Sequence, residues 1–188
     1  MRKMITILLL IVTTCLLCSC SLGGPSSPGG SRTNMLNNSD EKNAAARLEQ
    51  VLEAIKNRDN DALKAMFSER ALGEADDFGG NVDYLFSFIQ GDIDSWEKPS
   101  GPTVFDSYNH GSKKKEVSSY YYINTDKQRY FFLLRDHPVD TDHPDNVGLY
   151  LLLAVRAEDE EMIWDGDNKI IYDGDTKLSH AGIYIPLK

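Results

Sequence analysis

The chain of 188 residues is 41% hydrophobic and 26% charged, and its formal net charge at pH 7 is −9. This acidic balance opposes contact with a phosphate backbone, so we expect no nucleic-acid partner. The length suits a single domain whose core is large enough to fold unaided.

The first residues have the pattern of an export signal. Arg2 and Lys3 precede an uncharged apolar run that ends near Leu17 and is shorter than the ~20 residues of a membrane-spanning helix. We therefore predict a signal peptide over residues 1–19. Its removal would leave 18 Lys and Arg against 29 Asp and Glu, a net charge of −11.

Leu17-Cys18-Ser19-Cys20 resembles the bacterial lipobox. The resemblance implies cleavage after Ser19 and a diacylglycerol on Cys20, and two acyl chains anchor a protein stably to a membrane. We therefore expect a protein held by lipid on the extracytoplasmic face of the cell membrane. An ordinary signal peptide, cut near Ser19 without lipid, is the alternative. Cys15 and Cys18 would be removed, so we expect no internal disulfide.

Residues 20–42 are rich in Gly, Ser, Pro and Asn, a composition that predicts a flexible, lipidated tether. Residues 43–188 would then form the folded domain.

Helical spacing of apolar residues dominates the first part of this domain. A charged face opposite an apolar stripe predicts a helix over residues 43–57. After a polar turn, with Asp59 or Asn60 as the cap, the spacing resumes. The later apolar positions are Leu63, Met66, Phe67 and Leu72, and then Val82, Leu85, Phe86 and Ile89, with Ile93 and Trp96 extending the last stripe.

Beyond Pro102 the spacing becomes alternating, and β-branched and aromatic residues predominate. The candidate strands are Thr103–His110, Glu116–Asn124, Gln128–Asp136 and Val147–Arg156, followed by shorter ones at Ile163–Trp164, Ile170–Tyr172 and Ile183–Pro186. Short connections at 111–115 and 125–127 favour antiparallel pairing, whereas 137–146 reads as a loop. Helices before an antiparallel meander predict an α+β fold.

Residues 52–68 (LEAIKNRDNDALKAMFS) resemble the opening of the nuclear-transport-factor-2-like (cystatin-like) superfamily. The resemblance extends over residues 43–157 and implies helices packed on a curved antiparallel sheet that forms a cone, with a pocket that binds ligands in many members and catalyses in a few. The lipobox, Ser68–Leu72 and Gly182–Pro186 are also similar to a family of uncharacterised Gram-positive bacterial lipoproteins with no assigned activity.

Asp106, Tyr108 and His110 alternate along the first strand and would share one face of the sheet. On a concave face, Asp106 or His110 could act as a general base and Tyr108 could donate to an oxyanion. The alternative is a solvated face that is polar because it contacts water.

Two acidic segments contain potential metal ligands. Residues 137–145 contain two histidines and three aspartates, and Asp-Gly-Asp occurs at both 165–167 and 173–175. A solvated acidic loop and ordinary Asp-Gly turns explain them better than metal sites do, so we assign no metal and no cofactor.

Aromatic residues are frequent on the second and third strands, at 120–122 and 130–132. Core packing accounts for such residues, and a pocket for an apolar or ring-bearing ligand is the alternative. The candidate ligand-binding residues are Trp96, Tyr121, Phe132 and Tyr150.

The sequence has no Gly-rich phosphate loop and no Gly-x-Ser-x-Gly elbow, which disfavours nucleotide hydrolysis and acyl transfer. We therefore expect a non-enzymatic surface lipoprotein that binds a ligand, a peptide or a partner protein at the cell envelope. A pocket enzyme of isomerase, dehydratase or hydrolase type, using Asp106, Tyr108 and His110, is the alternative. A purely structural module is the third hypothesis.

Overall fold

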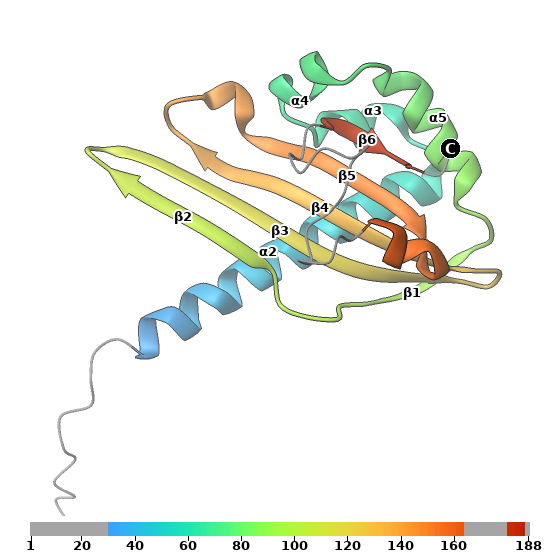
Figure 1. Cartoon of the computed structure of the whole chain (residues 1–188), viewed down its shortest axis with the longest axis horizontal. Coiled ribbons are helices and arrows are strands. Elements are labelled where there is room, and N and C mark those ends of the chain that lie inside the picture. The colour runs from blue at the N-terminus through green and yellow to red at the C-terminus, as the bar shows by residue number, and fades with distance from the viewer. Residues whose placement is uncertain (1–29, 164–179, 187–188) are drawn as a thin grey trace, which may run out of the picture. The chain divides into compact units, whose positions relative to one another are not determined.

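The computed structural model describes the backbone of residues 30–163 and 180–186, and the side chains from residue 38 except that of Met162. Residues 35–188 cluster into one compact unit. The unit is α+β, with helices on its N-terminal side followed by a six-stranded mixed sheet that is not closed (Figure 1). Within the described ranges, no helix is long and apolar enough to cross a membrane.

Several predicted features lie outside the described residues. They are the signal peptide over 1–19, Cys20, Trp164, the strand Ile170–Tyr172 and the two Asp-Gly-Asp segments.

Helix α2 (Gly30–Asn57) covers one face of the sheet with its C-terminal part (Figure 1). Its predicted stripe is confirmed, with Leu48, Val51, Leu52 and Ile55 buried in the main core. The helix begins before residue 43 and overlaps residues 30–42 of the predicted tether. Contacts with the sheet explain part of this earlier start of the helix. An ion pair holds Asp40 against Lys115, and such tertiary contacts override a weak helix propensity.

Short capped helices follow. Asp59 and Ser68 cap α3 (Asn60–Ala65) and α4 (Glu69–Glu74), because their side-chain oxygens accept hydrogen bonds from backbone amides of the first turn. Asp77 caps α5 (Phe78–Phe88) in the same way.

The predicted extension of the third helix to Ile93 and Trp96 is wrong. The chain turns at Gly91, whose φ is +84°, a conformation that favours glycine. Ile93 and Trp96 then lie in strand β1 (Ile93–Glu97) and pair with β3.

The predicted meander is confirmed for four strands. They are β2 (Thr103–Asn109), β3 (Ser112–Thr125), β4 (Arg129–Asp140) and β5 (Gly148–Arg156), paired antiparallel in chain order. Strands β1 and β2 both pair with the same edge of β3. The short strand β1 pairs near the C-terminal end of β3, and β2 pairs near its N-terminal end. At the other side of the sheet, the predicted last strand is β6 (Gly182–Tyr184), which pairs parallel with β5.

Two predicted connections are shorter than expected. Only His110 and Gly111 separate β2 from β3, and their φ values of 49° and 92° suit a two-residue hairpin turn. The prediction of a loop over 111–115 is therefore wrong for the lysine run, which the register pairs with β2. Residues 137–140 continue β4, and the connection to β5 contains the 3-10 turn η1 (Pro144–Asn146).

Both faces of the central strands are buried. Phe132, Leu134 and Leu152 lie in the main core with the helices. Phe131 and Leu133 lie in a second core on the opposite face, with Ile163 of the 3-10 helix η2 (Ala157–Ile163). This two-sided burial explains why β4 and β5 contain nearly continuous apolar runs, and it places polar sites toward the ends of the strands.

A close approach between α4 and β5 gives a first prediction. Gly148 has a φ of +128°, and a Cβ there would lie 2.9 Å from the Ser68 amide nitrogen. We expect Gly148→Ala to lower the free energy of unfolding by about 2–4 kcal/mol, measured by urea unfolding.

Gly73→Ala is the matched control, because no heavy atom outside its own stretch of the helix lies within 4 Å of its Cβ position. It lies inside α4, so we expect a stabilisation of about 0.5–1 kcal/mol. Equal losses in the two variants would show that the close approach does not constrain position 148.

Candidate functional site

Small side chains leave hollows where α2 begins to cover the sheet. Ala44 is buried against the sheet, and Ala45 follows it, in a part of the helix that lacks the large apolar residues found from Leu48 onward. Because protein interiors are otherwise close-packed, this shortage of volume leaves space. Two cavities, of about 270 Å³ and about 190 Å³, flank the helix, and Ser119 of β3 lines both.

The larger hollow, which we call the aromatic cavity, lies between α2, β1 and β3. Its walls include Trp96, Tyr120 and Tyr121, with Ala45 contributed by α2. The rings of Trp96 and Tyr121 meet edge to face, with their centroids 5.5 Å apart. Burial raises the pKa of the Tyr121 hydroxyl, which keeps it neutral and able to donate a hydrogen bond.

Charged residues surround the rim of the aromatic cavity. Glu41 of α2 forms an ion pair with Lys98, which follows β1. This pair joins the helix to the connection between β1 and β2, where Pro102 also lines the cavity. The opening is therefore polar while the interior is ring-lined, the usual character of a small-molecule site.

The smaller hollow, the charged cavity, is lined by residues that tie α2 to the sheet. The Lys115 ammonium lies 2.5 Å from a carboxylate oxygen of Asp40, and Arg47 Nε lies 2.8 Å from Asp136 Oδ2. Asp136 Oδ1 is buried and has no hydrogen-bond donor among the described residues. These groups are engaged with one another across the helix–sheet interface, so their main role is to position α2.

The structure brings two of the four candidate ligand-binding residues together. Trp96 and Tyr121 share the aromatic cavity. Phe132 pairs in register with Tyr121 but is fully buried in the main core, and it lines neither hollow. Tyr150 lies elsewhere, beside α4. The run of alanines at 44–46 is the sequence signal that could have indicated the hollows, whereas the long-range pairs of the charged cavity left no local pattern.

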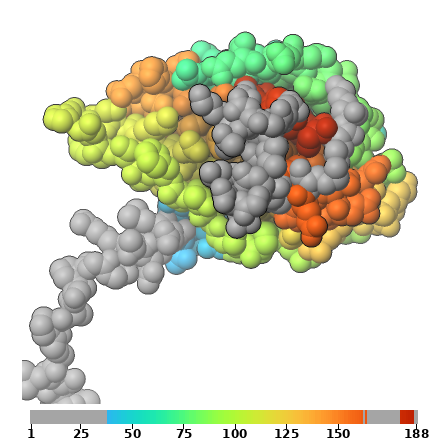
Figure 2. Space-filling model, viewed as in Figure 1, coloured from blue at the N-terminus to red at the C-terminus, as the bar shows by residue number. Residues whose placement is uncertain are grey.

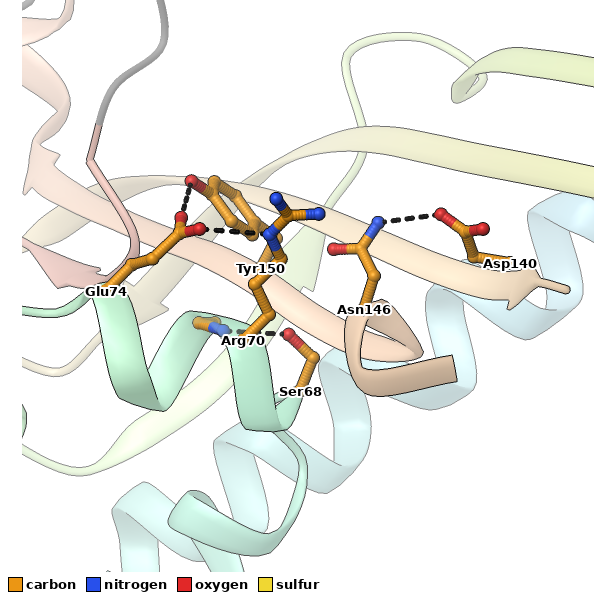
Figure 3. Close-up of polar contacts among 7 residues, drawn as sticks. Ser68, Arg70, Glu74, Asp140, Asn146 and Tyr150 are labelled. Atoms are coloured by element: carbon orange, nitrogen blue, oxygen red, sulfur yellow. Dashed lines mark hydrogen bonds and ion pairs between the residues drawn. The ribbon is translucent and has the colours of Figure 1, made fainter. Parts of the chain in front are cut away.

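Tyr150 belongs to a polar cluster under α4 (Figure 3). Its hydroxyl donates to Glu74 Oε2 at 2.7 Å, and Arg70 Nε donates to Glu74 Oε1 at 2.9 Å. Burial and the bond to Glu74 raise the pKa of Tyr150 to about 12. In the same view, the Asn146 amide donates to Asp140 Oδ2 at 3.0 Å.

The residues of the alternative catalytic set do not converge on a cavity. Asp106 pairs across the strands with Lys115, with its oxygen 4.0 Å from the ammonium. Tyr108 is 76% exposed, and His110 occupies the hairpin turn, outside the strand that was predicted to include it. Figure 2 shows this β2–β3 hairpin projecting from the domain. None of the three lines either hollow beside α2, so they form no water-excluded site for proton transfer.

The acidic segment 137–145 is divided between strand and turn. His137 and Asp140 are buried in β4, and Asp140 accepts hydrogen bonds from the His143 amide and from Asn146. In the part of the chain that the structure describes, no group of three or more His, Cys, Asp or Glu residues is placed to hold a metal ion.

The Tyr150–Glu74 bond gives a second prediction. Hydrogen bonds from Tyr150 and then Arg70 hold the pKa of Glu74 below its ordinary value. Tyr150→Phe should raise this pKa, as measured by carbon NMR titration of the carboxyl group. A lowered folded-state pKa stabilises the protein above the unfolded-state pKa. The stability that the variant loses at neutral pH should therefore shrink as the pH falls through the lowered pKa.

Tyr122→Phe is the control, since it removes a hydroxyl that donates to Glu160 instead. It should leave the pKa of Glu74 unchanged. A Glu74 titration that is identical in the wild type and in Tyr150→Phe would contradict the assigned bond.

Comparison with known proteins identifies one family. No match was found among curated proteins. Residues 50–157 match the domain of unknown function DUF5104. The matched segment covers more than half of the chain and runs from the second half of α2 to the residue after β5, so it includes Trp96, Tyr121 and Tyr150. The chain therefore belongs to the DUF5104 family.

Proposed function

We propose that this chain is a lipid-anchored binding protein of the extracytoplasmic membrane face, whose aromatic cavity binds a small ring-bearing, largely apolar ligand. The observation that carries the proposal is the hollow beside Ala45, with Trp96 and Tyr121 in its wall. The order of helices and antiparallel strands supports a nuclear-transport-factor-2-like fold, in which pockets between helices and sheet are common binding sites.

The size and lining of the cavity favour a small molecule over a protein partner. About 270 Å³ is slightly below the usual range for small-molecule sites, roughly 300–1,000 Å³, and would hold one or two fused rings. Aromatic walls bind such rings by apolar contact and by edge-to-face packing. The amide of Asn38 could orient the ligand, and the hydroxyl of Ser119 is hydrogen-bonded to Tyr121 in the same wall.

A binding role without catalysis is consistent with the ion pairs that the charged residues near the cavity form. Glu41 is paired with Lys98, and Asp40 is paired with Lys115. Both of these carboxylates of α2 are therefore already engaged in ion pairs. The pocket-enzyme hypothesis therefore gains no support from these residues.

Anchoring follows from the lipobox at residues 17–20. Diacylation of Cys20 would keep the domain at the membrane surface although its net charge is negative, because the hydrocarbon chains supply the membrane affinity. The binding site would then sample solutes at the cell envelope.

Filling the cavity tests the proposed ligand site. Ala45→Leu adds apolar volume inside the hollow without removing a contact. We expect it to weaken binding of indole and naphthalene fragments at least tenfold, measured by saturation-transfer NMR with the full chain in detergent.

Ala46→Leu is the matched control, because Ala46 is the exposed neighbour on another side of the helix. It should leave fragment affinity within twofold of the wild type. Fragments that bind all three proteins equally, or none of them, would rule out the aromatic cavity as their site.

The anchor is tested separately. In a bacterial host that processes lipoproteins, Cys20→Ser should move the protein from the membrane fraction to the soluble extracytoplasmic fraction. Mass spectrometry of the wild type should find Cys20 as the lipid-modified first residue. An unmodified Cys20, or wild-type protein that retains residues 1–19, would overturn the lipoprotein assignment.

A further inference from the structure

A further pocket, which we call the polar pocket, lies on the face of the sheet opposite α2. Its volume is about 240 Å³. The lining residues are Arg70, Glu74, Lys114, Arg135, His137, Asn146 and Tyr150. It has no lining residue in common with the aromatic cavity.

The alternation of side chains along a strand explains which cations line the polar pocket. Lys115 and Asp136 point toward α2, as their ion pairs with the helix show. Their neighbours Lys114 and Arg135 therefore point to the opposite face. Arg70 reaches the same pocket from α4, so three positive side chains from three separate elements line one hollow in an acidic protein.

Irregularities in two adjacent strands shape the pocket. The register between β3 and β4 shifts between Lys115 and Val117, where β4 carries an extra residue around His137. The register between β4 and β5 shifts at Tyr150, which lies between the paired residues Leu149 and Leu151. Such bulges re-aim side chains and are frequent next to functional sites. Here they bring the rings of His137 and Tyr150 edge to face, 6.0 Å apart.

Polar atoms on the side of the pocket that is lined by cations still lack partners among the described residues. Arg135 Nε lies 3.3 Å from Glu116 Oε1, yet it is buried without a hydrogen-bond acceptor. Lys114 has no ion-pair partner among the residues described. His137 is 4% exposed, and its Nδ1 has no hydrogen-bond partner in that part of the chain. Leaving buried donors unsatisfied is costly, so an acceptor ligand would be stabilising.

Among the described residues, Glu74 is the one carboxylate that lines the pocket, and it is already engaged. Both oxygens of Glu74 accept hydrogen bonds, one from Arg70 and one from Tyr150. Burial lowers the pKa of His137, so the positive charge of the pocket comes from its arginines and lysine.

We propose that the polar pocket binds the oxyanion group of a small molecule, a carboxylate or a phosphate, with Arg135 and Lys114 as its donors. A guanidinium presents two parallel N–H groups to such a group, and an ammonium adds a compact charge. The paired rings of His137 and Tyr150 provide an apolar wall for the rest of the ligand. This site is independent of the aromatic cavity, so either could fail without the other.

Amide NMR of the full chain in detergent tests the proposal, with sodium phosphate and sodium acetate titrated separately at constant pH and ionic strength. We expect saturable shifts at Lys114, Arg135 and His137 with at least one anion. Saturation by phosphate alone, by acetate alone or by both identifies which oxyanion the site accepts.

Matched lysine variants separate a site from general charge effects. Lys114→Gln should weaken anion binding roughly tenfold, whereas Lys113→Gln removes the same charge one residue away, on the other face, and should change it less than twofold. Arg135→Gln should also weaken binding, with its fold checked by circular dichroism. Because Lys114 is exposed, its variant tests the proposal even if Arg135→Gln fails to fold. No saturable shift with either anion, or equal effects of the two lysine variants, would overturn the proposal.

Discussion

The packing of α2 on the sheet is the interaction on which the rest of the structure depends. From Leu48 to Ile55 the helix buries large side chains and closes the main core. At Ala44 and Ala45 the same helix leaves hollows on both flanks, and the ion pairs of Asp40 and Arg47 hold it in place there. One helix thus provides the stability of the domain and its best candidate binding site.

The sheet imposes a second constraint, because its central strands are buried on both faces. Polar side chains therefore lie toward the strand ends, where bulges interrupt the pairing at His137 and Tyr150. The aromatic cavity and the polar pocket lie on opposite faces and offer different chemistry, rings on one side and cations on the other. The two hollows share no lining residue, so a ligand in one would not obstruct the other.

Much of the fold could be predicted from local patterns. The stripe of α2 follows directly from burial on one face of the helix, the strands β2 to β5 follow from their β-branched and aromatic residues, and the cap of α3 follows from Asp59. Features set by distant partners could not be predicted. Trp96 leaves the helical pattern because it pairs with β3, and Arg47 meets Asp136 from 89 residues away. For the same reason, only part of the candidate site could be predicted. Its aromatic residues were recognisable in the sequence, but the hollow depends on how α2 lies across them.

We propose that a ligand ring occupies the space beside Ala45, between α2 and the wall formed by Trp96 and Tyr121. Intermolecular nuclear Overhauser effects from a bound aromatic fragment test this placement. A ring in the aromatic cavity should show contacts to the Ala45 methyl group and to the Trp96 indole in the same complex. Contacts confined to other residues, with none to Ala45 or Trp96, would contradict it.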